Sequence, residues 1–173
     1  MNGSDTTSST GSSVEVLISV IADTHIKAPG KDLPESAYEW IRKSDAVIHA
    51  GDLVNNIILD RLNDCASAVY AVLGNNDHGV QLPLFLELEI DKVSIAVIHD
   101  TGPRDGRRKR MRKQFPNARI VVYGHSHIPD CSDEDGLLLL NPGSPTDKRR
   151  QPVHTMALLH LNDGDFVAEI VNV

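Results

Sequence analysis

The chain has 173 residues, 40% of them apolar, and a formal net charge of −7 at pH 7. This length fits one domain with a core on two faces, and predicts no second domain. The negative charge argues against attraction of nucleic acid to the whole surface, so nucleic acid is not expected as a stable partner. No apolar stretch approaches the roughly 20 residues that span a bilayer, so no membrane partner is expected either.

The start of the chain differs in composition from the rest. Residues 1–13 are rich in Ser, Thr and Gly and lack the basic region and apolar core of a secretory signal. We therefore expect a disordered tail at 1–13, a folded domain at 14–173 and a cytoplasmic location. Cys65 and Cys131 form no closely spaced pair and predict no disulfide framework. The oligomeric state stays open, with a homo-oligomer as one alternative.

The first half of the chain alternates between apolar runs and amphipathic segments. The runs 14–22, 46–50 and 68–73 are rich in β-branched residues, which predicts buried strands. Pro34 opens the first predicted helix, and Asn55 caps the second. The order β-α-β-α-β predicts a parallel sheet with helical crossovers.

The second half contains more closely spaced strands. Only two residues separate the apolar runs 84–90 and 93–98, which predicts a hairpin. A basic helix is predicted over 103–115. Further strands are expected at 120–123, 136–140, 154–161 and 166–171. This spacing leaves no room for a helix in every crossover, so it favours two sheets packed face to face, with helices outside, over one doubly wound sheet.

Side chains with metal-ligand chemistry follow five of the apolar runs. They occur in the segments Asp23-x-His25, Gly51-Asp52, Gly74-Asn75-Asn76-Asp77, His99-Asp100 and Gly124-His125-Ser126-His127. Because ligands in α/β sheets bind outside the carboxyl ends of strands, these segments are expected to converge. Hard oxygens and imidazoles gathered from several strands are what a two-metal hydrolytic site needs. The spacing therefore predicts one metal site.

The residue types within these segments suit shared cations. Asp23 and His25 lie two apart, so on extended chain they point to the same side and can share one ion. Gly51 lets the backbone come close to the metals, and Asp52 can bridge two ions with its two oxygens. Asn75 supplies a neutral amide oxygen. Each segment alone is more often loop polarity or a hydrogen-bonded histidine, but the five together favour a metal site.

This ordered set resembles the calcineurin-like metallophosphoesterases, from about Val14 to the end of the chain. Within this family, the chain is most similar to the small YfcE-type phosphodiesterase branch. It shares with that branch the short length, the segment 141–144 after the double-histidine motif, and a residue other than histidine after Asn75. The resemblance implies an α/β fold, a four-layer α/β/β/α sandwich of two mixed β-sheets packed face to face with helices outside. It also implies a dinuclear metal centre.

By motif position, the resemblance implies one metal held by Asp23, His25, Asp52 and His127. It implies a second metal held by Asp52, Asn75, His99 and His125, with Asp52 as the bridge. Two divalent ions roughly 3.5 to 4 Å apart can hold a bridging hydroxide for in-line attack on phosphorus. The mixture of hard oxygens and imidazoles favours Mn²⁺, with Fe, Zn, Ni and Co as alternatives. Catalytic roles are expected for Asp52, Asn75, Asn76 and His99, with a small phosphodiester as substrate.

Two positions depart from the family pattern. Many relatives have histidine at the position of Asn76, where it protonates the leaving oxygen, and an amide cannot deliver that proton. This predicts a preference for phosphodiesters with good leaving groups over alkyl monoesters. With no histidine to orient, Asp77 is left to cap the following turn. Asp100 and Thr101 stand where related small phosphodiesterases often read His-Gly-His, so the supporting roles that follow His99 in those relatives are not carried over to this chain.

Two basic segments leave alternatives open. The run 104–113 is either an anion-binding rim close to His99 or a solvated helix face. In the second segment, at 148–150, Arg149 is a candidate contact for substrate phosphate together with Asn76, and the alternative is an exposed loop. His49 lies within an apolar strand, so a buried and hydrogen-bonded role is favoured over a ligand role.

Two other functions compete with that of a metal-dependent phosphodiesterase. The first is a non-catalytic scaffold similar to the retromer scaffold subunit, which has this fold and a degraded metal centre. The complete ligand set argues against it, because a pure scaffold has no chemical need for those residues. The second is a phosphomonoesterase or protein phosphatase, which Asn76 and the short loops disfavour. The natural substrate stays open.

Overall fold

Two mixed sheets form the centre of this computed structural model, which describes residues 15–173. The predicted disordered tail lies outside the described residues. The first sheet has five strands in the order β10-β9-β1-β2-β3. Their bounds are β1 (Val16–Ile21), β2 (Ala46–His49), β3 (Val69–Ala71), β9 (Thr155–Asn162) and β10 (Asp165–Asn172). Strands β1, β2 and β3 run parallel, whereas β9 and β10 are antiparallel additions at one side.

The second sheet also has five strands, in the order β4-β5-β6-β8-β7. Their bounds are β4 (Phe85–Ile90), β5 (Val93–Ile98), β6 (Ile120–Val122), β7 (Asp130–Glu134) and β8 (Leu137–Asn141). Strands β5, β6 and β8 run parallel, and β4 and β7 pair antiparallel at the two edges. The predicted β4–β5 hairpin is confirmed. Its two turn residues, Asp91 and Lys92, have φ of +47° and +66°, as a two-residue hairpin turn of type I′ requires.

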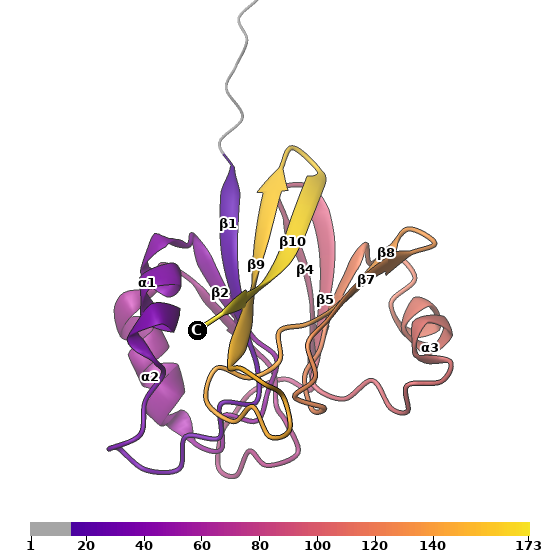
Figure 1. The fold of residues 1–173 in the computed structure, drawn as a ribbon. Helices are drawn as coiled ribbons and strands as arrows, with labels where there is room; N and C mark the ends of the chain where they lie inside the picture. The colour runs from indigo at the N-terminus through magenta and orange to yellow at the C-terminus, as the bar shows by residue number, and fades with distance from the viewer. Residues whose placement is uncertain (1–14) are drawn as a thin grey trace, which may run out of the picture.

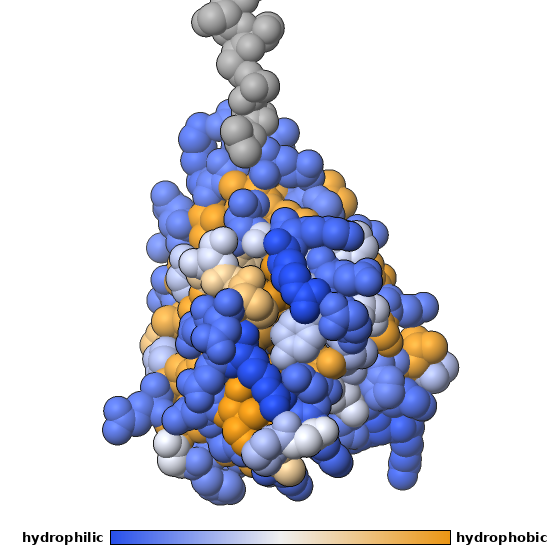
Figure 2. Space-filling model, turned by 90° about the vertical axis from the view of Figure 1, so that its left-hand side faces the viewer, coloured by the Kyte–Doolittle hydropathy of each residue, from blue (hydrophilic) through white to orange (hydrophobic). Residues whose placement is uncertain are grey.

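Helices cover the outer faces of both sheets. Helices α1 (Glu35–Lys43) and α2 (Asn56–Cys65) lie against the first sheet, and α3 (Arg107–Gln114) lies against the second (Figure 1). The predicted four-layer α/β/β/α sandwich is therefore confirmed. The side that carries α1 and α2 has a mainly hydrophilic surface broken by small hydrophobic patches (Figure 2). Within residues 15–173, no helix combines the length and apolar character that crossing a bilayer demands.

Alternation along the strands explains how both faces of each sheet are buried. On β1, Ile18 and Val20 join the core between the sheets, whereas Ile21 packs with the helices. From the second sheet, Ile95 and Ile120 face the same central core. A strand buried on both faces has no solvent side, which is why these runs are almost continuously apolar.

Two elements differ from the predictions. Helix α3 begins at Arg107 rather than at Pro103, because Gly106 takes the N-cap position with φ +71° and the preceding residues form a turn. Strand β7 was not predicted. Its sequence DCSDE has no apolar alternation, and it forms by pairing with the buried β8 at the edge of the sheet.

Two arginines of α3 have a structural role that was not among the alternatives for the basic run 104–113. Arg108 donates to the carbonyl oxygens of Ser132 and Glu134, each at 3.0 Å, and also to that of Leu137. Arg112 donates to the carbonyl oxygen of Ala118 at 3.0 Å. These guanidinium groups fasten α3 to the β7–β8 hairpin and the loop before β6. Lys109 and Lys113 on the same helix are exposed, as the solvated-face alternative expects, and anion binding by this run stays a prediction.

Candidate metal centre

The predicted ligands come from both sheets and meet at one end of the sandwich. Asp23, His25, Asp52 and Asn75 follow the parallel strands β1, β2 and β3 of the first sheet. His99, His125 and His127 follow β5 and β6 of the second sheet. The two sets are joined directly, because the His125 backbone N–H donates to Asp23 Oδ1 at 3.1 Å. The rule that ligands gather at the carboxyl ends of strands thus brings seven separated residues into one cluster.

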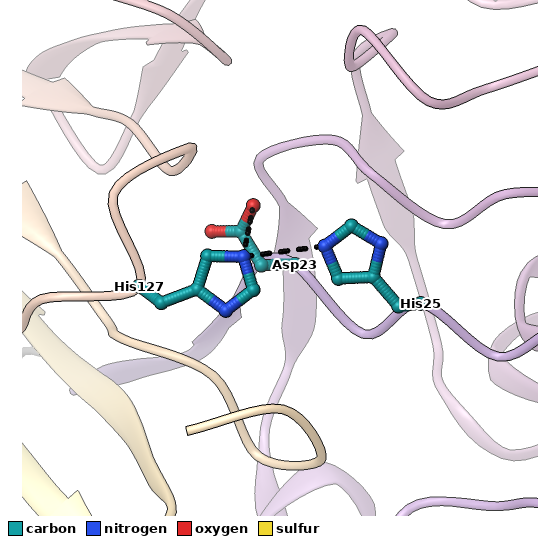
Figure 3. Close-up of side chains that lie close together, drawn as sticks. All are labelled: Asp23, His25 and His127. Atoms are coloured by element: carbon teal, nitrogen blue, oxygen red, sulfur yellow. Dashed lines mark hydrogen bonds and ion pairs between the residues drawn. The ribbon is translucent and has the colours of Figure 1, made fainter. Parts of the chain in front are cut away.

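One group consists of Asp23, His25 and His127, whose side chains point toward one another (Figure 3). The Nε2 atoms of His25 and His127 are 3.2 Å apart, and their rings stack with centroids 5.1 Å apart. His127 Nε2 lies 3.6 Å from Asp23 Oδ1. Two imidazole nitrogens and a carboxylate oxygen that converge in this way have the composition and reach to bind one cation.

Asp52 connects this group to a second one. Its Oδ2 lies 3.5 Å from His25 Nε2, and its Oδ1 lies 3.5 Å from His99 Nε2. The Asn75 side-chain oxygen is 3.1 Å from His99 Nε2 and 2.9 Å from His125 Nδ1. Each oxygen of the Asp52 carboxylate therefore faces a different histidine, as a carboxylate between two cations must.

Burial makes the cluster electrostatically incomplete. Asp23 is fully buried, and its Oδ2 has no hydrogen-bond partner among the described residues. Burial and the neighbouring Asp52 charge raise the pKa of Asp23 to about 8. Burial also lowers the pKa of His25 and of His127, which favours their neutral, ligating form. A divalent cation would supply both the missing partner and the missing positive charge, so these residues fit a metal centre.

Carbonyl oxygens fix the orientation of two histidines. His99 Nδ1 lies 2.8 Å from the Ala50 carbonyl oxygen, and His127 Nδ1 lies 2.5 Å from that of Asp147. A carbonyl only accepts, so Nδ1 must carry the proton in both rings. Nε2 is then the unprotonated nitrogen, and it is the Nε2 atoms that face the carboxylates.

Asn76 contacts Asp52 with two donors. Its backbone N–H donates to Asp52 Oδ1 at 2.8 Å, and its side-chain amide donates to Oδ2 at 2.6 Å. Burial alone would raise the pKa of Asp52, but these hydrogen bonds and the nearby His99 and His25 outweigh it, so the pKa is lowered. Asn76 therefore helps to keep Asp52 ionised and aligned, a role that the sequence did not suggest.

The glycines before the ligands provide room for them. A Cβ atom added at Gly74 would lie 2.2 Å from both the backbone nitrogen and Oδ1 of Asp52. Gly51 has φ +90°, and a Cβ there would lie 2.7 Å from His99 Nδ1. The predicted reason for Gly51, close approach of the backbone to the site, agrees with this geometry.

The backbone of most candidate ligands is strained. Five of the seven have positive φ: Asp23 at +54°, His25 at +45°, Asp52 at +61°, His125 at +68° and His127 at +57°. Such conformations cost free energy in residues other than glycine, and they persist only where the surrounding structure enforces them. The strain indicates that the fold holds these side chains in place rather than leaving them free to adjust.

Asp77 is a structural residue whose importance the sequence did not reveal. Its Oδ2 accepts from the backbone nitrogens of Gly74 at 2.7 Å and Asp52 at 3.1 Å, and its Oδ1 accepts from that of Val54 at 2.5 Å. It was expected only to cap a turn. Instead it ties the loop after β3 to the loop after β2, which carries Asp52. No local pattern could have shown this, because two of its partners lie in a different loop.

The remaining predicted residues lie around the cluster. His49 is fully buried, accepts from Gly51 N at 3.2 Å and lies 3.0 Å from Thr24 Oγ1. Burial lowers its pKa to about 3, in keeping with the predicted buried, hydrogen-bonded role. Arg149 is exposed and lines a cavity of about 780 Å³ together with His25 and Asn76. Its contact with substrate phosphate stays a prediction.

Comparisons with known proteins identify the family to which this arrangement belongs. A probable metallophosphoesterase of Methanocaldococcus jannaschii is 38% identical over 151 residues, which cover 86% of this chain and 77% of that protein. A phosphodiesterase of the same organism is 25% identical over 146 residues, which cover 73% and 82%. Among solved structures, Vacuolar Protein Sorting 29 from Cryptosporidium parvum shares the fold, with a TM-score of 0.77, 21% identity, and coverage of 92% of this chain and 98% of that one.

The family model for the calcineurin-like phosphoesterase superfamily domain matches residues 16–164. That match runs from the first strand to the turn between the last two, and includes every candidate ligand. The family predicted from the ordered motifs is therefore confirmed, and this chain belongs to the calcineurin-like phosphoesterase superfamily.

Proposed function

We propose that this protein is a dinuclear metal-dependent phosphodiesterase, with Mn²⁺ as the favoured ion. The observation that supports this most strongly is the Asp52 carboxylate, whose Oδ2 faces His25 and whose Oδ1 faces His99, at 3.5 Å each. One ion would be held by Asp23, His25, Asp52 and His127. The other would be held by Asp52, Asn75, His99 and His125. A phosphodiesterase among the relatives supports the reaction class.

When bound, two divalent ions would activate a water molecule and neutralise charge on the phosphoryl oxygens. The residues of the chain prepare for this chemistry. Asn76 keeps the Asp52 carboxylate ionised and aligned, and the carbonyl partners of His99 and His127 hold the neutral rings in the tautomer that leaves Nε2 available for a metal. Arg149, at the cavity beside His25, would bind an oxygen of the substrate phosphate.

A non-catalytic scaffold is the main alternative, since the structural neighbour in Cryptosporidium parvum is a vacuolar sorting protein. The chemistry of the cluster disfavours this alternative. A buried carboxylate with one unpartnered oxygen, such as Asp23, destabilises a fold unless a ligand compensates for it. Left-handed backbone at five ligands adds to that cost. A scaffold would gain nothing from retaining either feature.

Metal content tests the proposal directly. Protein stripped of metals and reloaded with Mn²⁺ is expected to retain about two ions per chain after gel filtration, because the two ligand groups share Asp52. Elemental analysis measures this ratio. The variant His160→Ala serves as a control, since His160 pairs with Glu15 and Glu169 outside the cluster and its loss should leave the ratio unchanged. A ratio near zero in folded protein would contradict the proposed function.

Asn76 provides a test of diester over monoester preference. The substitution Asn76→His is expected to raise hydrolysis of phosphomonoesters relative to diesters, because an imidazolium can protonate a poor leaving group and an amide cannot. The quantity to measure is the ratio of kcat/KM values for an alkyl monoester, glycerol 2-phosphate, and the aryl diester bis(p-nitrophenyl) phosphate, because only the alkyl monoester has a poor leaving group. The pH profile should gain an ionisation near the imidazole reference of about 6.5.

The variant Asn76→Ala separates this gain from the loss of the Asp52 contacts. It removes the side-chain donor to Asp52 Oδ2 without adding an acid, so total activity should fall while the ratio stays as in the wild type. If the wild type already hydrolyses alkyl monoesters better than aryl diesters, another residue supplies the proton. The phosphomonoesterase alternative would then replace the proposal.

A further inference from the structure

The cavity beside the metal centre has a size that suits more than one phosphate. Its volume of about 780 Å³ falls in the range of small-molecule sites, which is roughly 300 to 1,000 Å³. His25 and Asn76 form part of its wall, so the cavity opens directly onto the cluster. A scissile group at the cluster would leave most of this space to the rest of the substrate.

Basic side chains outnumber acidic ones on the wall of this cavity, although the whole chain has a net charge of −7. Lys27, Lys31 and Arg149 line it, against the carboxylates of Asp32 and Asp147. Both carboxylates have cationic partners: Asp32 Oδ1 is 3.1 Å from Arg61 NH1, and Asp147 Oδ2 is 3.9 Å from Arg149 Nε.

The two carboxylates of the wall pair with Arg61 and Arg149 rather than with Lys27 or Lys31. These two exposed ammonium groups are therefore the cations of the wall that are left to attract an anion.

The loop that carries the two lysines is held in place by α2. Arg61 donates from NH1 to the carbonyl oxygen of Lys31 at 2.7 Å and from NH2 to that of Pro29 at 2.6 Å. On the opposite wall, Thr146 Oγ1 donates to the carbonyl oxygen of Thr24 at 2.6 Å. The backbone around the cavity is thus fixed by side chains from neighbouring elements, and only the lysine side chains need to be ordered by a ligand.

The wall offers no large aromatic ring to a nucleobase. None of the described residues that line the cavity is Phe, Tyr or Trp. Only smaller groups that can stack on a base, such as His154 and Arg149, line the cavity, so we expect it to discriminate ligands by charge more than by base identity.

We propose that this cavity is a subsite for a second phosphate group of the substrate, bound by Lys27 and Lys31. The substrate class is then a phosphodiester that also carries a terminal phosphomonoester, rather than a neutral diester. This inference rests on the proposed phosphodiesterase function, because it takes the metal cluster as the place of the scissile group.

A pair of dinucleotides that differ in one phosphate tests the subsite. Protein loaded with Mn²⁺ is expected to hydrolyse 5′-phosphorylated diadenosine monophosphate, pApA, with a kcat/KM about tenfold above that for ApA, since a charge-assisted phosphate contact is worth about that factor. The double variant Lys27→Ala/Lys31→Ala should bring the ratio close to one. It should lower hydrolysis of bis(p-nitrophenyl) phosphate less than hydrolysis of pApA, because that diester has no second phosphate.

Lys113→Ala is the matched control, since this exposed lysine lies on α3 against the other sheet. It should keep the wild-type preference for pApA. Equal kcat/KM values for the two dinucleotides in the wild type, or a preference that survives the double variant, would overturn the subsite.

A binding measurement separates failure of the subsite from failure of the proposed function. By calorimetry, adenosine 3′,5′-bisphosphate is expected to bind the loaded wild type about tenfold more tightly than adenosine 5′-monophosphate, and the double variant should lose this difference. If none of the diesters is hydrolysed, the proposed function fails, and the ratio of the two affinities still decides whether the cavity selects a second phosphate. Equal affinities of the wild type for the bisphosphate and the monophosphate would exclude the second-phosphate subsite.

Discussion

Replacing Asp52 by asparagine is expected to lower kcat/KM for bis(p-nitrophenyl) phosphate on the order of 10³-fold while the fold is retained. Asp52 is the residue whose two oxygens face histidines of both ligand groups. Asparagine offers one carbonyl oxygen, carries no charge, and turns an N–H₂ group toward the amide donors of Asn76. The bridge between the two proposed ions would be lost, and one donor of Asn76 would be left without an acceptor.

Steady-state kinetics with Mn²⁺, metal analysis and circular dichroism together test this expectation. Metal content should fall below two ions per chain while the circular dichroism spectrum stays that of the wild type. Asp60→Asn is the matched control, because Asp60 is an exposed aspartate on α2 outside the cluster, and its activity should be normal. Turnover near the wild-type rate in Asp52→Asn would show that the bridging role is assigned to the wrong residue.

The substitution Gly74→Ala is expected to damage the site by steric crowding alone. The added Cβ would lie 2.2 Å from both Asp52 N and Asp52 Oδ1. Neither atom can move away freely, because Asp77 accepts a hydrogen bond from the first and Asn76 donates to the second. We expect a loss of stability on the order of 1–3 kcal/mol from overpacking. Because the displaced Asp52 is the proposed bridge, activity should fall on the order of 100-fold.

Gly30→Ala is the comparison variant for this test, since a Cβ at Gly30 would have no atom within 4 Å. Urea denaturation gives the free energy of unfolding, and elemental analysis gives the metal content. Gly30→Ala should match the wild type in both. A Gly74→Ala protein with full activity and two bound ions would contradict the close approach of the two loops around Asp52.

The strands of the central core and the family motifs were predictable because each depends on local sequence. Runs such as 46–50 and 93–98 are apolar except for His49 and Ser94, and helical layers on the outside leave these strands without a solvent face. The convergence of Asp23 and His125 followed from a general rule for parallel strands. Asn55 was recognisable as a helix cap, and its side chain accepts from Ile57 N at 2.9 Å.

Features that depend on distant partners could not be predicted in this way. Strand β7 is polar throughout and owes its conformation to β8. The sequence of the basic run on α3 is typical of a charged surface, but Arg108 within it donates hydrogen bonds to carbonyl oxygens of the β7–β8 hairpin. Asp77 and Asn76 gained their roles from the neighbouring loop that carries Asp52. In each case the deciding contact joins segments that the sequence alone does not bring together.

The origin of the ligands in two different sheets has a consequence for the kinetics of unfolding. His25 and His127 lie 102 positions apart in sequence, yet their Nε2 atoms are 3.2 Å apart. Such long-range contacts form late, after the sheets have docked, because chain closure over that separation is entropically costly. A cation bound between them would stabilise the native state far more than the folding transition state. It would therefore slow unfolding and leave the folding rate almost unchanged, so chelation would shorten the lifetime of the folded protein.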